Sequence, residues 1–135
     1  MDTVTPAKRS YVMSRVKGKD TSPERIVRHL VYHAGFRYRL YDPRLPGKPD
    51  LVFWGKRKVI FVHGCFWHGH EGCRRNRIPK SNQEYWSTKL EKNRTRDSLN
   101  LSKLHEMGWR VLVVWECELK ETDILLGKLK SFLEE

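Results

Sequence analysis

The chain has few cysteines and no long hydrophobic segment. Its 135 residues include three cysteines, an odd number that excludes a fully paired disulfide framework of the secreted type. No apolar run is long enough to cross a membrane, and the opening residues MDTVTPAKRS lack the hydrophobic core of a signal peptide. No coiled-coil pattern calls for a partner subunit. We therefore expect a cytoplasmic monomer with no membrane partner and a single domain over residues 1–135.

Acidic residues are also scarce relative to basic ones. The chain has 27 lysines and arginines against 16 aspartates and glutamates, a net charge of +11. This surplus disfavours cationic partners and favours a polyanion, most simply nucleic acid. The basic residues gather at positions 8–19, 74–80 and 89–96. A generally solubilising surface is the alternative, but aromatic residues lie beside two of these clusters.

The order of the expected elements is typical of a single α/β domain. Capping boxes, Thr21 with Glu24 and Ser81 with Glu84, predict the starts of two helices, which Gly35 and Gly108 end. The alternating residues 36–40 predict a strand. The apolar runs 51–54 and 59–62 flank a short turn with a glycine and predict a hairpin. Residues 109–116 predict a strand buried on both faces, and residues 122–134 predict a last helix.

Residues 63–73, HGCFWHGHEGC, carry the side chains that metals prefer. Structural zinc takes four ligands, usually cysteine and histidine. Cys65 and Cys73 with His70 between them can supply three. Cys117, at the end of the strand predicted at 109–116, can supply the fourth if the two strand ends meet. His63 and His68 are then left over. Buried inert cysteines beside a surface histidine loop are the alternative interpretation.

The long helix from residue 82 has two polar residues where apolar ones are expected. Its inward stripe, at helical spacing, places Asn93 and Asp97 between Leu90 and Leu101. An inward carboxylate needs a partner, so Asp97 is a candidate for orienting a catalytic histidine. The alternative is a gap in the core where the helix overhangs solvent.

Asp50 follows Pro49 directly before the hairpin. A Pro-Asp pair leading into a strand, turn and strand is how many metal-dependent nucleases mount a carboxylate. Mg²⁺ needs few protein oxygens, so Asp50 is a candidate ligand near His63. An ordinary turn aspartate is the alternative.

Together, Pro49-Asp50, HGCFWHGH, EYW, KN…RD and GWRVLVVWECE make the chain resemble the very short patch repair endonucleases, from about residue 7 to 120. The resemblance implies a PD-(D/E)xK restriction-endonuclease-like core, with a mixed central sheet flanked by helices and a zinc-stabilised loop. It also implies a bacterial enzyme that acts at the nucleoid and nicks DNA beside the thymine of a T:G mismatch, the product of 5-methylcytosine deamination.

The resemblance also implies roles for individual residues. Asp50 matches a Mg²⁺ ligand, and Val62 matches a second ligand position, where only its backbone carbonyl can bind. His63 and His68 match the catalytic histidines. Asp97 and Asn93 match residues that support these histidines, and Glu24 matches an acidic residue near the scissile phosphate. The structural zinc ligands are matched by Cys65, His70, Cys73 and Cys117, with His68 as the rival of His70.

DNA contacts are implied as well. Phe66 and Trp67 match aromatics that wedge into the duplex, and Met13 matches a residue inserted from the opposite groove; two core aromatics are the alternative. Residues 1–20 are expected to form a basic DNA-contacting arm, and further contacts are expected from Arg74, Arg75, Arg77, Lys80 and Lys89.

The expected partner is double-stranded DNA with a T:G mismatch, with mismatch-repair proteins as candidates. Rival functions are an inactive zinc-stabilised mismatch-binding module and a same-fold nuclease with another target.

Overall fold

The computed structural model of the protein describes residues 21–73 and 80–135. The expected DNA contacts Met13, Arg74, Arg75 and Arg77 and the whole expected arm at 1–20 lie outside these ranges. The elements are, in chain order, α2 (Ser22–His33), β1 (Leu51–Phe53), the 3₁₀ turn η1 (Trp54–Lys56), β2 (Lys58–His63), α3 (Gln83–Glu106), β3 (Arg110–Trp115), the 3₁₀ turn η2 (Glu116–Lys120) and α4 (Thr122–Glu134).

A three-stranded mixed sheet in the order β1-β2-β3 forms the centre of the fold. β1 and β2 form the expected antiparallel hairpin. β2 and β3 are parallel and in register from Lys58↔Arg110 to His63↔Trp115, so α3 is the crossover between them, as parallel neighbours require. The strands β2 and β3 therefore end at the same edge of the sheet, directly before the loop at residue 64 and before Cys117.

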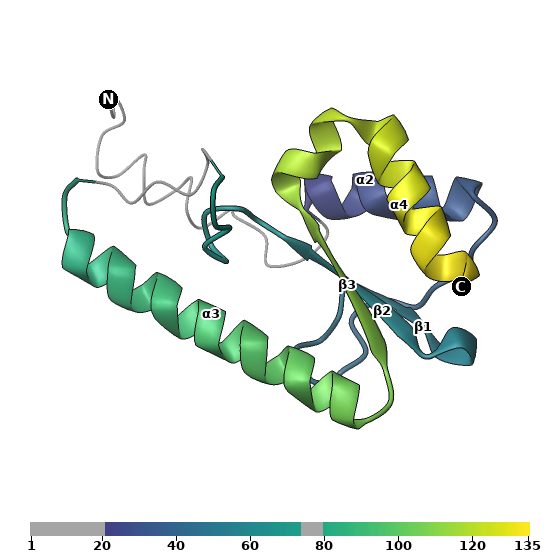
Figure 1. The fold of residues 1–135 in the computed structure, drawn as a ribbon, viewed down its shortest axis with the longest axis horizontal. Helices are drawn as coiled ribbons and strands as arrows, with labels where there is room; N and C mark the ends of the chain where they lie inside the picture. The colour runs from purple at the N-terminus through teal and green to yellow at the C-terminus, as the bar shows by residue number, and fades with distance from the viewer. Residues whose placement is uncertain (1–20, 74–79) are drawn as a thin grey trace.

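Helices cover both faces of the sheet (Figure 1). α2 and α4 lie on one face, where Val27 and Leu129 pack against Ile60 and Val114. α3 lies across the other face. There Leu104 of α3 and Trp109, directly before β3, pack against residues of the β1–β2 hairpin. Within the described residues, no helix is long and apolar enough to span a bilayer. This arrangement confirms the mixed α/β class with a central sheet flanked by helices.

The helix and strand boundaries differ from the expectations at several points. Residues 36–40 contribute only a single bridge, Arg39↔Val52, so the strand predicted there is wrong. Neither predicted capping box forms, since Thr21 makes no side-chain cap and α3 begins at Gln83 after Asn82 in a left-handed conformation (φ 56°). The strand predicted to be buried on both faces is mostly half-buried in β3, where Val114 alone is fully buried.

Candidate active site and metal cluster

A cleft of about 990 Å³ opens beside the ends of β1 and β2. Asp50 lies directly before β1, and Val62 and His63 are the last residues of β2. The cleft is lined by Glu24 of α2, by His68 of the following loop and by α3. The sequence-predicted candidates Glu24, Asp50, Val62, His63, His68 and Asp97 thus meet in one place, although α2 and α3 lie on opposite faces of the sheet.

Asp50 and Glu24 supply the acidic groups of the cleft. The backbone N–H of Val62 donates to Asp50 Oδ2 at 2.6 Å. The pKa of Asp50 is raised to about 7, mainly by burial; the Val62 hydrogen bond lowers it, and the nearby Glu24 carboxylate contributes to the rise. Glu24 is itself buried and accepts hydrogen bonds from Arg28 and from the Tyr41 hydroxyl. A buried carboxylate beside a half-buried one favours a bound proton or cation.

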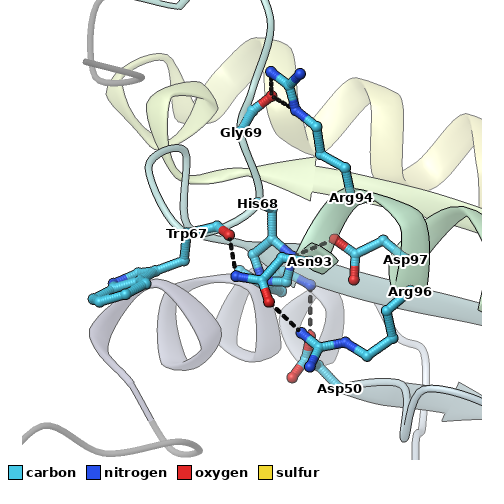
Figure 2. A network of polar contacts seen from close by, with 9 residues as sticks. Asp50, Trp67, His68, Gly69, Asn93, Arg94, Arg96 and Asp97 are labelled. Carbon is cyan, nitrogen blue, oxygen red and sulfur yellow. Dashed lines mark hydrogen bonds and ion pairs between the residues drawn. The ribbon is translucent and has the colours of Figure 1, made fainter. Parts of the chain in front are cut away.

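His63 and His68 stack face to face, with ring centroids 3.8 Å apart and planes 5° from parallel. His68 Nδ1 lies 2.6 Å from Asp97 Oδ2, the partner expected for the inward carboxylate of α3 (Figure 2). Burial lowers the pKa of His63 to about 4, with a smaller contribution from His68, so His63 is neutral near pH 7. Its buried Nδ1 has no hydrogen-bond partner among the described residues.

A second group lies beyond the end of β3. One ligand atom each from Cys65, His70, Cys73 and Cys117 lie within 4.8 Å of one another. Cys117 Sγ is 3.5 Å from His70 Nδ1, close to the roughly 3.6 Å between two ligands of tetrahedral zinc. Cys117 joins this group because β3 ends beside β2, as expected. His68 belongs to the cleft instead, so the geometry favours His70 over its rival.

The chemistry of the donor set also fits a metal. All three cysteines are free thiols rather than disulfides. Burial raises the pKa of Cys65 to about 12 and also raises that of Cys117. Thiolates at these positions therefore need a cation to balance their charge. The His70 ring stacks on Trp115 at 4.1 Å, and His63 meets the edge of the same indole at 5.2 Å, so one tryptophan separates the two groups.

The predicted wedge residues contact an aromatic cluster rather than the main core. Phe66 and Trp67 pack edge to face on each other, and both contact Trp86 of α3. Trp67 is 38% exposed. Lys89 Nζ lies 5.4 Å from the Trp67 ring, whereas Lys80 is simply exposed. Trp86, in the first turn of α3, thus joins the helix to the loop that carries Phe66 and Trp67.

Three further residues of the site were missed. Arg28 and Tyr41 hold Glu24, and only the spacing of four between Glu24 and Arg28 pointed to that contact. Arg94 of α3 donates to the Gly69 carbonyl. Asn93, expected to support the histidines, reaches them only through the backbone, since its Nδ2 donates to the Trp67 carbonyl at 2.9 Å.

Comparison with known proteins identifies the family of the chain. Residues 1–75 match the family model described as DNA mismatch endonuclease Vsr. The chain is 42% identical to the DNA mismatch endonuclease Vsr of Escherichia coli over 99% of its own length and 86% of that protein. The chain belongs to the Vsr family of DNA mismatch endonucleases. The resemblance seen in the motifs is thereby confirmed.

Other Vsr relatives align over almost the whole chain. The type II nicking enzyme V.XorIIP of Xanthomonas oryzae pv. oryzae is 49% identical, over 98% of this chain and 97% of that protein. The type II nicking enzyme V.NmeAIP of Neisseria meningitidis is 46% identical, over 99% and 95%. Membership of this family makes the protein a DNA endonuclease, which is a hydrolase.

Proposed function

We propose that the protein nicks duplex DNA beside the thymine of a T:G mismatch by Mg²⁺-dependent hydrolysis, on a PD-(D/E)xK-type core. The observation that carries the proposal is the cleft itself: a histidine held by a carboxylate, His68 with Asp97, faces the same space as the acidic pair Asp50 and Glu24. A nuclease needs these two elements together, one to align water and one to hold a cation at the phosphate.

Asp50 and the Val62 carbonyl are the proposed magnesium ligands, with Glu24 near the scissile phosphate. Mg²⁺ binds protein through one or two oxygens and keeps several waters, which suits this sparse donor set. When bound, it neutralises charge that develops on the phosphate and lowers the pKa of water. The Val62 N–H holds one Asp50 oxygen at 2.6 Å, which fixes the direction of the carboxylate.

His68 is the proposed general base. The Asp97 carboxylate accepts from Nδ1–H of His68, which leaves the lone pair on Nε2 to accept a proton from water. His63 is neutral near pH 7 and is proposed to donate an N–H to the phosphate or to the leaving oxygen. The reverse assignment is the alternative, and it is disfavoured because no carboxylate among the described residues hydrogen-bonds to His63.

Zinc is the proposed ion for Cys65, His70, Cys73 and Cys117. Three sulfurs and one imidazole match the ligand preference of a closed structural zinc site. This role is structural, because the loop from 64 to 73 has few apolar residues to hold its shape and a metal supplies that constraint.

The aromatic cluster and the basic charge suit a distorted duplex. Phe66 and Trp67 are proposed to wedge beside the mismatch, with Lys89 over the Trp67 ring and with Lys80 near the backbone. A T:G wobble pair is easier to unstack than a matched pair. The remaining contacts are assigned to residues 1–20 and to Arg74, Arg75 and Arg77. We take the protein to act as a single-domain monomer, with mismatch-repair proteins as further candidate partners.

A nicking assay tests this function. Labelled duplexes that differ only in one base pair, T:G, C:G or T:A, are incubated with and without added Mg²⁺. We expect Mg²⁺-dependent cutting of the thymine strand at T:G only. Asp50→Ala should slow it by at least about 100-fold, whereas Asp123→Ala, an exposed acid on α4, should not. Equal cutting of all duplexes would indicate a different nuclease target, and tight T:G binding without cutting would indicate a binding module.

A further inference from the structure

Three neighbouring residues of α3 contact three consecutive residues of the loop after β2 (Figure 2). Asn93 Nδ2 donates to the Trp67 carbonyl at 2.9 Å, and Asp97 Oδ2 lies 2.6 Å from His68 Nδ1. Arg94 donates twice to the Gly69 carbonyl, from Nε at 3.1 Å and from Nη2 at 2.7 Å. Residues three and four apart share a helix face, so this one face of α3 follows the loop residue by residue.

The contact between Arg94 and Gly69 depends on the absence of a side chain at position 69. Gly69 is buried and has a left-handed backbone (φ +60°). A Cβ built on it would lie 2.3 Å from Arg94 Nε, closer than side-chain carbons approach other atoms. Only glycine therefore allows the guanidinium to come this near while it adopts that φ. The missing side chain at position 69 and the arginine at position 94 form a matched pair.

Gly69 also lies at a decisive place in the chain. It joins His68 of the cleft to His70 of the Cys/His group, which lie on either side of it. The N–H of the peptide that follows Gly69 donates to the Cys65 carbonyl at 2.9 Å, and the carbonyl of the same peptide accepts from Arg94. The two donors of Arg94 form a fork on one carbonyl oxygen, which fixes both the position and the direction of that peptide.

We propose that Arg94 is a positioning residue for the nicking reaction: by holding the Gly69 carbonyl it keeps His68 aligned with Asp97. The inference rests on the proposed function, in which His68 is the base. It assigns the Arg94 guanidinium to a contact within the protein rather than to the DNA backbone, although Arg94 is an exposed residue in a run of basic residues that would each suit phosphate.

Single-turnover nicking of the T:G duplex, with titrated enzyme, separates the two roles. Arg94→Gln should lower the rate at saturating enzyme by about 10- to 100-fold, the usual effect of losing a partner that orients a functional group. The enzyme concentration that gives half of the maximal rate, which reports DNA binding, should change no more than in Lys103→Gln, which removes an exposed charge from the same helix. Arg94→Lys, which keeps the charge but loses the fork, should fall between Arg94→Gln and the wild type. A normal rate with weaker saturation would overturn the proposal and make Arg94 a phosphate contact.

A double-mutant cycle tests the matched pair directly. Gly69→Ala should slow nicking because its Cβ meets Arg94. Arg94→Ala should slow it because the Gly69 carbonyl loses both hydrogen bonds from Arg94, which together we call the clamp. The variant with both changes should be no slower than Gly69→Ala alone, because the new Cβ then has room. If the two rate reductions simply multiply, the pair is not a clamp and the proposal fails.

One measurement is independent of nicking. The His68 Nδ1–H proton, assigned by its loss in His68→Gln, should shift or broaden in the DNA-free Arg94→Gln protein and stay unchanged in Lys103→Gln. If the wild-type protein does not nick T:G duplexes, the proposed function fails, while this resonance still decides whether Arg94 positions His68. An unchanged resonance in folded Arg94→Gln protein would refute the positioning role.

Discussion

Asp50 and His63 should make opposite contributions to the pH dependence of folding in the absence of Mg²⁺. Burial lowers the pKa of His63 from 6.5 to about 4, so its stabilising contribution is complete above pH 6.5 and is lost as the pH falls towards 4. This loss amounts to about 3 kcal/mol. The pKa of Asp50 is raised from 3.8 to about 7. Its contribution is therefore complete below pH 4 and is lost as the pH rises to 7, an effect of about 4 kcal/mol in the opposite direction.

The two contributions to the free energy of unfolding nearly cancel in the wild-type protein. Replacing either residue should therefore reveal the pH dependence that the other one causes. Asp50→Asn removes the stability that Asp50 adds as the pH falls. Between pH 7 and pH 4 the free energy of unfolding of this variant should therefore fall by up to about 4 kcal/mol relative to the wild type. His63→Gln removes the stability loss that His63 causes as the pH falls. Between pH 6.5 and pH 4 the free energy of unfolding of this variant should rise by up to about 3 kcal/mol relative to the wild type. Contributions that all three proteins share, including the Cys/His group, drop out of these differences.

Urea unfolding at pH 4.5, 5.5, 6.5 and 7.5 without added Mg²⁺ measures these differences. Asp123→Asn, an exposed acid on α4, serves as the control and should run parallel to the wild type. Parallel curves for Asp50→Asn and the wild type would refute the argument, because they would mean that Asp50 titrates alike in the folded and unfolded chains. Added Mg²⁺ at pH 7.5 should stabilise the wild type more than Asp50→Asn, since only the wild type offers the Asp50 carboxylate as a ligand.

Three further predictions concern other parts of the molecule. Lys58→Met should destabilise the protein by about 1–3 kcal/mol, because the buried Nζ of Lys58 donates to the carbonyls of Phe132 and Glu135 at 2.6 and 2.9 Å; urea unfolding measures this, with the exposed Lys130→Met as control. Trp67→Ala should reduce the preference for T:G over T:A duplexes in a binding titration, by about 1–3 kcal/mol for one lost base stack, and an unchanged preference would refute the wedge. Cys117→Ser should lower both the bound zinc, measured by elemental analysis, and the thermal midpoint, whereas a full zinc content in that variant would exclude Cys117 as a ligand.

The parts of the fold that could be predicted are those whose evidence is local or periodic. The spacing of apolar residues is enough for α2, α3 and α4, because a helix buries one face wherever it packs. The alternation at residues 36–40 was misleading, since a strand exists only if a partner is available, and only Arg39 pairs there. The two capping boxes failed for a similar reason: a three-residue spacing permits a cap, but neighbouring contacts decide where the chain turns.

The candidate site divides in the same way. Asp97 was predictable because a carboxylate on an apolar stripe must have a partner, and His68 provides it. Cys117 was predictable once two strands were expected to end together. Arg94 and Tyr41 were not, because a basic residue among basic residues, or a tyrosine in a loop, carries no mark of the long-range contact that it makes. Met13 and the arginines at 74, 75 and 77 stay predictions.

The register of the two parallel strands has a consequence for which changes of length the protein can tolerate. His63 is paired with Trp115 at the last rung of the ladder, so position along β3 determines which side chain reaches the Cys/His group. One residue inserted or deleted within β3 would turn the later side chains of the strand to the opposite face, removing Trp115 from between His63 and His70, and would shift Cys117 of the following turn η2 away from its partners. Natural variation in chain length among relatives should therefore avoid β3, and an alignment gap there would signal a protein that has lost both groups at once.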